Sequence, residues 1–507
     1  MSVTTYDLVV IGGGTAGLTA AVGAAGQGAR TLLIERGRTG GDCLWTGCVP
    51  SKALLTVAER AHSVRTAGEL GVHTTEPRVD FDAAMAHVRQ AITILAPHDS
   101  PERLRDVGVE VVQATGRFVG PDRIEVAGRL VRFRHAMLAT GAAPVIPPIP
   151  GLAEAAPLTS ETVWDLAELP EKLVVLGGGP IGVELGQAFA RLGAQVTVVE
   201  MADGLLPREE PRAQQVIASS LQADGVDVRV GTRAVRVEAP EAGGDRGDPS
   251  GPTPGGGGSA GAGRHRLVVA SDAGEDAVAF DEILVAVGRR PIVEGLGLEA
   301  AGVQLDHRGA VRVDDHLRTT NPRVYAGGDV TMLLPFTHTA SAHGSTVVQN
   351  ALFGLRRRVD HERLPWVTFT APEVARVGPS LEEATRRYGD RVHVHTVDHV
   401  ALDRAVAAGD TAGFAMLIGD PKGRIVGATV VGPRAGEVIG EVVAWMAGGA
   451  SISDIVRTTH AYPTWNEDIT AASLAELRLL LRRYRVVTRG VLWLRRRWLD
   501  RPQRTKR

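Results

Sequence analysis

The chain has 507 residues, of which 44% are hydrophobic and 22% charged, and its formal net charge is −2. This composition is typical of a globular protein, and the length predicts about three domains. No apolar run reaches about 18 residues, which excludes a membrane-spanning helix. No basic segment followed by an apolar stretch precedes Tyr6, so we expect no secretory signal and a cytoplasmic location.

The charge is unevenly distributed. Residues 478–507 hold twelve Lys or Arg side chains and the single acid Asp500, a local balance of +11, which leaves −13 for the first 477 residues. An acidic body argues against a nucleic-acid enzyme, so we expect no nucleic-acid partner. The basic end requires its own explanation.

The first predicted elements form a strand–turn–helix–strand unit. It consists of a strand at 6–11, the glycines Gly12, Gly14 and Gly17, a helix at 18–29, a strand at 31–34 and Glu35. In this context G-x-G-x-x-G permits a tight turn and brings a pyrophosphate close to the N-terminus of a helix. Glu35 is placed to hydrogen-bond a ribose hydroxyl. The unit therefore predicts a dinucleotide site.

The two cysteines, Cys43 and Cys48, lie five residues apart shortly after this unit, and the chain has no other. That excludes a disulfide scaffold and a Cys-rich metal site, and we expect no resident metal. In a reducing cytosol a close cysteine pair is typically catalytic rather than structural. We interpret the pair as a dithiol that opens and closes during turnover. The alternative is two buried cysteines that act as small hydrophobic side chains.

The same unit occurs a second time. It consists of a strand at 173–176, the glycines Gly177, Gly179 and Gly182, a helix to about residue 192, a strand at 195–199 and Glu200. Two dinucleotide sites imply two nucleotide cofactors, one retained and one exchanged. Residues 239–266, rich in Gly and Pro, have almost no apolar side chains, so we expect a flexible loop inserted in this second domain.

Two shorter motifs and a change of pattern follow. The strand from His135 ends in a turn that holds the cofactor-binding candidates Thr140 and Gly141, and residues 320–329 form a strand that ends at Asp329. From residue 364 the pattern becomes that of an α+β domain. Its predicted strands lie at 366–369, 413–418 and 425–431, and its predicted helices at 380–388 and 436–448.

These motifs, in this order over about residues 5–475, resemble the flavoprotein disulfide reductases, the class I pyridine nucleotide-disulfide oxidoreductases. The resemblance implies an α/β fold with two Rossmann-like domains, for FAD and NAD, and a C-terminal α+β domain that forms a homodimer. FAD would be held by the first glycine motif and Asp329. The implied domains are the first part of the FAD domain at 1–150, the NAD(P) domain at 151–280, the returning FAD and central segment at 281–355, the dimerisation domain at 364–475 and a tail at 476–507.

The resemblance also implies the chemistry. A nicotinamide would pass hydride to FAD, and the reduced flavin would reduce a Cys43–Cys48 disulfide. Cys48 would be the thiolate nearest the flavin, and Cys43 would attack the substrate. Lys52 resembles a lysine beside the flavin, and Glu184 resembles its ion-pair partner. Glu200 would repel a 2′-phosphate, which favours NAD(H) over NADP(H).

The C-terminal motif departs from the family pattern. Disulfide reductases of this group supply a base in His-Pro-Thr-x-x-Glu, whereas this chain has Tyr462-Pro-Thr-Trp-Asn-Glu467. A phenol is a poor base at neutral pH, so exchange with lipoamide or glutathione should be slow. His460 could substitute only if the backbone shifts. Tyrosine here resembles the mercuric reductases, yet these carry a further C-terminal cysteine pair that is absent here.

The tail has a seven-residue apolar repeat. Its members are Leu477, Tyr484, Val491 and Trp498, with Leu480, Val487 and Leu494 between them. We expect a basic amphipathic helix interrupted at Gly490. Three partners remain open: an anionic membrane surface contacted through 477–500, the protein's own dimer, and RNA as the weakest option.

The leading hypothesis is a homodimeric, FAD-dependent NAD(P)H oxidoreductase. It would pass electrons through Cys43 and Cys48 to a small acceptor, which could be a disulfide, a metal ion such as Hg²⁺, or a quinone. The catalytic candidates are Cys43, Cys48, Lys52, Glu184, Tyr462 and Glu467. The alternatives are a peripheral membrane NADH:quinone reductase, a dihydrolipoamide dehydrogenase, and a flavoprotein sensor without enzymatic activity.

Overall fold

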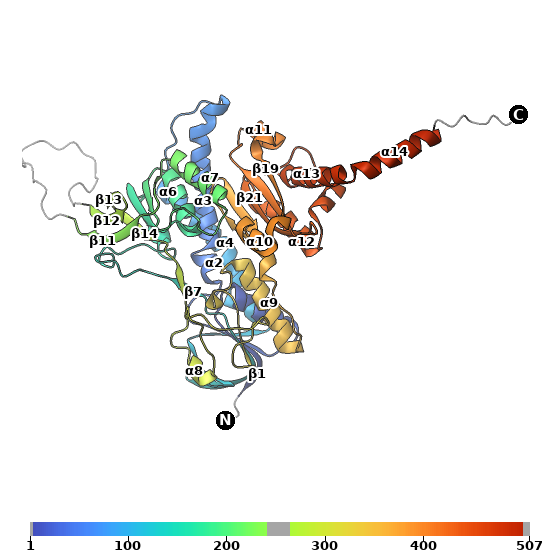
Figure 1. Cartoon of the computed structure of the whole chain (residues 1–507). Coiled ribbons are helices and arrows are strands. Elements are labelled where there is room, and N and C mark those ends of the chain that lie inside the picture. Colours follow the sequence, from blue (N-terminus) through green and yellow to red (C-terminus); the bar gives the residue numbers. More distant parts are fainter. Residues whose placement is uncertain (1–3, 241–263, 500–507) are drawn as a thin grey trace, which may run out of the picture. The chain divides into compact units, whose positions relative to one another are not determined.

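The computed structural model describes residues 4–240 and 264–499. The chain divides into two compact units. The first comprises the residues up to 208 together with 217–361, and the second comprises 209–216 and the residues from 362 onward. Figure 1 labels the elements along the chain. The predicted flexible loop lies largely at 241–263, outside the described residues.

The first unit is built around a seven-stranded sheet in the order β3-β2-β1-β6-β5-β4, with β16 paired to β6. Its strands are β1 (Thr5–Ile11), β2 (Thr31–Glu35), β3 (Val109–Gln113), β4 (Gly116–Gly120), β5 (Arg123–Val126), β6 (Arg129–Leu138) and β16 (Val324–Ala326). The ladders around β1 are parallel, with Leu8 opposite Thr31 and also opposite His135. Both faces of β1 are buried, which explains why it reads as a continuous apolar run.

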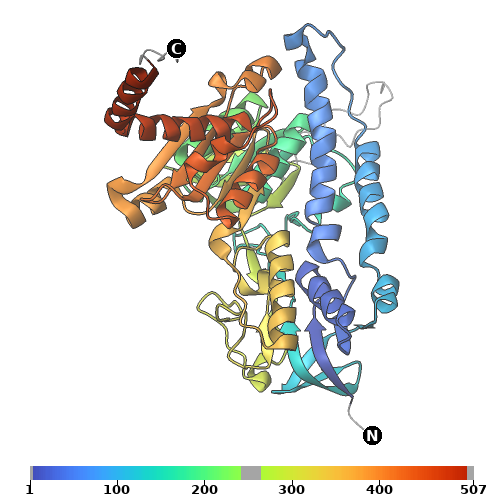
Figure 2. The same ribbon diagram turned by 90° about the vertical axis from the view of Figure 1, so that its right-hand side faces the viewer.

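Helices cover this sheet and carry the cysteines. They are α1 (Thr15–Gly26), α2 (Gly41–Trp45), α3 (Cys48–Thr66), α4 (Phe81–Leu95), α5 (Pro101–Asp106), α8 (Leu298–Ala301) and α9 (Thr337–Phe353). Helices α1 and α9 share a core with the Leu8 and Val10 side of β1. Helices α3 and α4 lie side by side, as Figure 2 shows. The start of α3 at Cys48 places this thiol at the N-terminus of a long helix.

A second, parallel sheet in the same unit has the order β10-β9-β8-β14. Its elements are β8 (Lys172–Leu176), α6 (Pro180–Leu192), β9 (Gln195–Val199), α7 (Pro211–Ala223), β10 (Asp227–Arg229) and β14 (Glu282–Val285). Beside it lie an antiparallel sheet of β11 (Arg233–Glu238), β12 (His265–Ser271) and β13 (Gly274–Phe280) and the ribbon of β7 (Ala142–Pro144) with β15 (Arg289–Pro291). Strand β14 pairs with β8, so this sheet extends past the boundary predicted at residue 280.

The second unit contains a five-stranded antiparallel sheet in the order β17-β18-β21-β20-β19. Its elements are β17 (Pro365–Thr368), β18 (Glu373–Val377), α10 (Leu381–Tyr388), β19 (His393–Asp398), α11 (Asp403–Ala408), β20 (Phe414–Gly419), β21 (Ile425–Gly432), α12 (Ala435–Ala447) and α13 (Glu467–Arg483). Helix α12 packs against β18 and β21, and α13 against β19 and β20. This is the α+β arrangement that the sequence predicts, although β18 and β19 were not foreseen.

The tail differs from its prediction in one respect. Helix α14 (Arg485–Leu499) runs through Gly490 without interruption, and the break lies instead at Tyr484, where α13 ends. A glycine inside a helix costs only about 1 kcal/mol relative to alanine, which is too little to end it. Among the described residues, no helix is both long and apolar enough to span a bilayer.

Candidate functional site

The first glycine motif forms a turn that only glycine fits. Gly12 has φ +107°, and a Cβ there would lie 2.2 Å from the carbonyl oxygen of Ala139. A Cβ at Gly17 would lie 1.9 Å from the carbonyl oxygen of Gly12. The turn leads directly into the N-terminus of α1, where backbone N–H groups favour an anion. The Glu35 carboxylate accepts hydrogen bonds from the N–H groups of Gly13 (2.6 Å) and Gly37 (2.7 Å), which hold it beside this turn.

A cavity of about 450 Å³ opens at this turn. The sequence-predicted residues that line it are Gly12, Gly14, Glu35, Cys43, Thr140, Gly141 and Asp329. Thr337 also lines it. The volume lies in the range of cofactor pockets. A glycine turn at a helix N-terminus, a carboxylate for a ribose and a thiol in one cavity fit FAD, so these residues would hold that cofactor.

Burial raises the pKa of Asp329, and the nearby Arg289 opposes this effect. The Arg289 guanidinium lies 4.0 Å from the Asp329 carboxylate and also bonds the Asp42 carboxylate. Arg289 therefore links the segment around Asp42, next to Cys43, to the segment that carries Asp329. It was not among the residues singled out from the sequence, because nothing local to it signals a site.

The second glycine motif repeats the geometry of the first. Gly177 has φ +114°, and a Cβ at Gly182 would lie 1.9 Å from the carbonyl oxygen of Gly177. Gly179 is the N-cap residue of α6. The Glu200 carboxylate accepts hydrogen bonds from the N–H groups of Gly178 (2.6 Å) and Ala202 (2.7 Å). The second turn thus matches the first in the way its carboxylate is held.

The two thiols lie at the start of α3 and within α2. Both are free, with Cys43 partly exposed and Cys48 exposed. The Sγ of Cys48 lies 3.2 Å from the Oγ1 of Thr337, the first residue of α9. Cys48 is therefore at the N-terminus of one helix and in contact with the N-terminus of another. The partial positive charge of both ends favours a thiolate.

The two thiols have opposite pKa shifts. The hydrogen bond from Cys43 lowers the pKa of Cys48 to about 6. Desolvation of the sulfur by neighbouring atoms opposes this, although the residue as a whole is exposed, and the Thr337 hydroxyl and the charge of Lys52 add to the lowering. The same hydrogen bond raises the pKa of Cys43, and burial raises it further. Cys48 is thus the thiol that ionises first. A thiolate next to a protonated thiol is the form expected of a reduced redox pair.

The ion pair expected from the sequence is present. The Lys52 Nζ, one turn after Cys48 on α3, lies 2.7 Å from the Glu184 Oε2 on α6. Glu184 is buried, with 7% of its surface exposed. The pair therefore connects the helix that begins at Cys48 to the first helix of the second nucleotide sheet.

The C-terminal candidates do not pair with each other. The Tyr462 hydroxyl donates to the Asp403 carboxylate at 2.9 Å, and this hydrogen bond raises the pKa of Tyr462. Burial raises the pKa of Glu467, whose Oε2 has no hydrogen-bond partner among the described residues. A phenol with a raised pKa is even less ionised at neutral pH than free tyrosine, so less phenolate is present to act as a base.

His460 is held in a way that the sequence did not indicate. Its Nε2 lies 2.6 Å from the Glu441 Oε1. Glu441 Oε2 also accepts from the side-chain amide of Asn466 at 2.5 Å. Burial opposes but does not outweigh these hydrogen bonds, which lower the pKa of Glu441. His460 thus pairs with the Glu441 carboxylate of α12.

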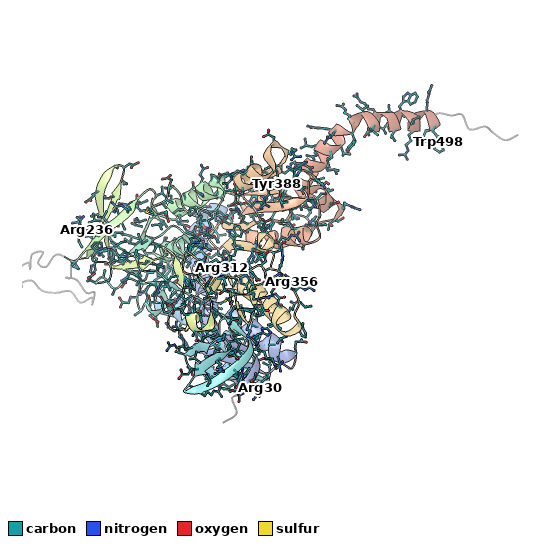
Figure 3. The ribbon with its side chains drawn as sticks, turned by 60° about the horizontal axis from the view of Figure 1, so that its bottom comes forward. Arg30, Arg236, Arg312, Arg356, Tyr388 and Trp498 are labelled. Carbon is teal, nitrogen blue, oxygen red and sulfur yellow. The ribbon has the colours of Figure 1, made fainter. Side chains whose placement is uncertain are left out.

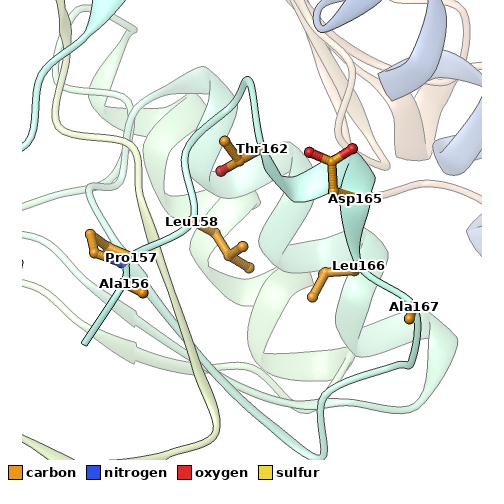
Figure 4. Close-up of a pocket in the computed structure, with 7 residues that line it drawn as sticks. All are labelled: Ala156, Pro157, Leu158, Thr162, Asp165, Leu166 and Ala167. Atoms are coloured by element: carbon orange, nitrogen blue, oxygen red, sulfur yellow. The ribbon is translucent and has the colours of Figure 1, made fainter. Parts of the chain in front are cut away.

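Thr337 was not among the candidate residues named from the sequence. It lies in the run Phe336-Thr-His338 after Asp329, a segment that the family resemblance places near the flavin. A second hollow of about 430 Å³ in the first unit is shown in Figure 4. Asp165 is the one titratable residue among those lining it, so we assign it no part in the redox chemistry.

Two glycine turns built alike, a cavity for a dinucleotide and a dithiol beside it define a flavin- and nicotinamide-dependent dithiol oxidoreductase. The chain belongs to the pyridine nucleotide-disulphide oxidoreductase family, whose model matches residues 6–344. The dimerisation domain of that family matches residues 364–473, which supports a homodimer. The chain is thus an oxidoreductase that uses FAD and a pyridine nucleotide.

Similar proteins span nearly the whole chain. A mercuric reductase of Streptomyces lividans is 36% identical over 479 residues, covering 93% of this chain and 96% of the relative. A dihydrolipoyl dehydrogenase of Thermus scotoductus is 35% identical over 480 residues, covering 93% and 97%. The solved Cu(II) complex of the HOCl-induced flavoprotein disulfide reductase RclA from Escherichia coli has a TM-score of 0.78 and 29% identity, covering 94% of this chain and 100% of that one.

Proposed function

We propose that this chain uses NADH to reduce a soft metal ion, Cu(II) or Hg(II), at the Cys43–Cys48 pair. The observation that carries the proposal is the Cys48 thiol, which touches Thr337 at two helix N-termini and has its pKa lowered to about 6. By the family resemblance, Cys48 would be the thiolate next to the flavin and Cys43 the thiol that meets the acceptor; in this structure Cys43 lines the cavity, and Cys48 contacts the cavity residue Thr337. When bound, FAD would supply the transfer of an electron pair from the nicotinamide to the disulfide.

The thiols supply the chemistry for a soft metal. Thiolates are the ligands that Hg²⁺ and copper ions prefer. Reoxidation of the Cys48 thiolate and the Cys43 thiol to the disulfide releases two electrons and the one proton of Cys43, and two electrons suffice for two Cu(II) to Cu(I) or for one Hg(II) to Hg(0). No cluster of three or more His, Cys, Asp or Glu side chains able to hold a metal occurs in residues 4–240 and 264–499. In this proposal the metal ion is a substrate that the two thiols bind during turnover.

Two of the similar proteins support a metal acceptor, since one is a mercuric reductase and another was solved as a Cu(II) complex. The C-terminal motif argues against a thiol substrate such as dihydrolipoamide. Deprotonation of such a thiol needs a base near neutral pH, and the hydrogen bond to Asp403 holds the pKa of Tyr462 above its usual value.

The preference for NADH rests on Glu200. Both of its carboxylate oxygens accept backbone N–H bonds, which fixes a negative charge at the end of β9. A carboxylate at this position of the motif binds a ribose 2′-hydroxyl and repels a 2′-phosphate. The candidates Lys52 and Glu184 orient the region around Cys48. Gly14, Gly17, Thr140, Gly141 and Asp329 contribute to the FAD site, and Gly177, Gly179 and Gly182 to the nicotinamide site.

We also propose that this chemistry takes place at the cytoplasmic face of a membrane. The proposal is supported by α14, which exposes apolar and arginine side chains together. This location is independent of the electron transfer at the thiols.

The test is anaerobic reduction of the purified holoenzyme by NADH, followed by separate addition of Cu²⁺, Hg²⁺, lipoamide, glutathione disulfide, a quinone and oxygen. We expect reoxidation of the dithiol to be fastest with a metal ion, and Cys43→Ser to abolish it while flavin reduction by NADH persists. Turnover with lipoamide or a quinone at rates above those for both metals would reject the proposal.

A further inference from the structure

The C-terminal helix presents an unusual combination of side chains. Residues 478–499 contain eight arginines and no Asp or Glu. None of the residues of α14 is buried. Figure 3 shows the side chains standing out along this helix, with Trp498 labelled near its end. A helix that buries nothing against its own domain gains no stability there, so its apolar residues require another partner.

The apolar side chains lie on one face of α14 and the preceding turn. They are Tyr484, Val487, Val491, Leu494 and Trp498, at alternating spacings of three and four residues. At 100° per residue these positions fall within one third of the helix circumference. Each is between 55% and 69% exposed. The helix therefore exposes a continuous apolar stripe about 20 Å long.

The opposite face is basic. The arginines of α14 that lie there are Arg485, Arg489 and Arg496. Trp493 lies on this basic face, and the Arg497 guanidinium stacks over its ring at 4.5 Å. A tryptophan among guanidinium groups suits the headgroup level of a bilayer.

Three kinds of partner could cover these two faces, and the distribution of charge on the helix distinguishes between them. Pairing with a second copy of α14 would bury the stripe but bring two sets of five arginines together without a counter-charge. A nucleic acid would neutralise the arginines but leave the stripe in water. An anionic lipid surface satisfies both faces, because its acyl chains take the apolar side chains and its headgroups the guanidinium groups.

We propose that α14 lies in the plane of an anionic membrane surface, with the stripe from Tyr484 to Trp498 immersed and the arginines among the headgroups. This inference rests on the membrane location proposed above, and it adds that the lipid surface is anionic. The homodimer carries two such helices, so attachment of the first raises the effective concentration of the second at the same surface. A dimer is therefore held more tightly than one helix alone would be.

The experiment is co-sedimentation of the full-length holoenzyme with phosphatidylcholine vesicles that contain none or about a third phosphatidylglycerol. Two matched variants test the orientation. Leu494→Asp and Leu492→Asp make the same change two residues apart, but Leu494 lies on the stripe and Leu492 on the basic side. Both side chains are exposed, so neither variant should impair folding.

We expect binding to the anionic vesicles only, weakening as salt is added. Leu494→Asp should weaken it about tenfold or more, and Leu492→Asp about threefold or less, since the latter removes no immersed side chain. Equal loss in both variants, equal binding to neutral vesicles, or no binding overturns the proposal. So does a Leu494-dependent assembly larger than a dimer, or tighter binding to RNA than to vesicles.

The readouts keep this proposal separate from the proposed enzymatic function. NADH-dependent metal reduction is measured without vesicles, where Leu494→Asp should match the unsubstituted protein because α14 lines no part of the cofactor cavity. If the protein fails to bind vesicles but reduces metal ions at the full rate, only the proposal for the tail is contradicted. If it binds vesicles normally but shows no turnover, only the proposed enzymatic function is contradicted.

Discussion

The hydroxyl oxygen of Thr337 lies 3.2 Å from the sulfur of Cys48. Cys48 is the first residue of α3 and Thr337 the first residue of α9, so the N-termini of two helices meet at one thiol. The two residues are 289 positions apart in the sequence. Both macrodipoles and the hydroxyl stabilise negative charge on this sulfur. The Lys52 ammonium adds to this effect from one turn further along α3.

Removal of the Thr337 hydroxyl should make the Cys48 thiolate harder to form. We expect Thr337→Val to raise the pKa of Cys48 by about one unit, because a hydrogen bond to a charged group is worth about 1.5 kcal/mol or more. The pH dependence of iodoacetamide alkylation in the reduced protein measures this pKa. Thr337→Ser keeps the hydroxyl and should behave like the unsubstituted protein; identical profiles for Val and Ser would contradict the contact.

The reactivity of the reduced enzyme should have a midpoint near pH 6. The pKa of Cys48 is lowered from its ordinary 9.0 to about 6. The thiolate therefore stabilises the reduced fold fully above pH 9, and this contribution is lost as the pH falls through about 6. Alkylation followed from pH 4 to 9 should show the midpoint, and Cys48→Ser should remove it. A midpoint above pH 8 would show that the sulfur is an ordinary thiol.

The Lys52–Glu184 pair should show energetic coupling. We expect Lys52→Met and Glu184→Gln each to lower stability, and the double variant to lose about 1 kcal/mol less than the sum, since the pair is partly exposed. Chemical denaturation of the four holoproteins gives the coupling energy. Arg290 and Glu294 form an exposed ion pair. The same cycle on this pair is the control, and it should give a smaller coupling energy. Simple additivity at Lys52 and Glu184 would argue against a structural role.

Nucleotide preference should respond to Glu200 and not to Glu35. Glu200→Gln removes the charge but keeps an acceptor for the backbone N–H groups, so we expect the ratio of kcat/KM for NADPH to that for NADH to rise about tenfold. Steady-state kinetics with both nucleotides measure the ratio. Glu35→Gln makes the same change in the first motif, and it should weaken FAD retention without altering the ratio. A ratio unchanged by Glu200→Gln would remove the basis for NADH preference.

Restoring a histidine at position 462 should favour thiol substrates. We expect Tyr462→His to raise dihydrolipoamide oxidation by about a hundredfold, the lower end of what a general base contributes. Asp403, which now accepts the Tyr462 hydrogen bond, would orient the imidazole. His460→Ala is the control, because His460 is engaged with Glu441 and should affect this substrate little. No gain in Tyr462→His would show that the missing base does not limit lipoamide turnover.

Short-range features of this protein were predictable. The strand, glycine turn, helix and acidic residue of each nucleotide motif lie within about 30 residues, and the steric demand at Gly12 or Gly177 is local to the turn. The Lys52–Glu184 pair was expected only through the family resemblance, since 132 residues separate its members.

The position of a helix boundary was predicted wrongly where the energies that favour one boundary over another are small. Gly490 was expected to interrupt the tail, yet α14 continues through it and the helix breaks at Tyr484 instead. Backbone propensity at a single position is worth about 1 kcal/mol, so it marks a boundary weakly. Strand β14, which follows the boundary predicted at residue 280, joins the sheet of β8 by a pairing across more than 100 residues that no local pattern indicates.

The amino-acid sequence by itself determined the two nucleotide motifs, the lone dithiol and the amphipathic basic end, because each depends on the spacing of neighbouring residues. Only the tertiary structure decided which groups surround the reactive sulfur and how the C-terminal loop is held. Thr337 reaches Cys48 from another helix, and Asp403 and Glu441 engage Tyr462 and His460 across 59 and 19 residues. Such contacts depend on the packing of distant elements, which no local pattern records.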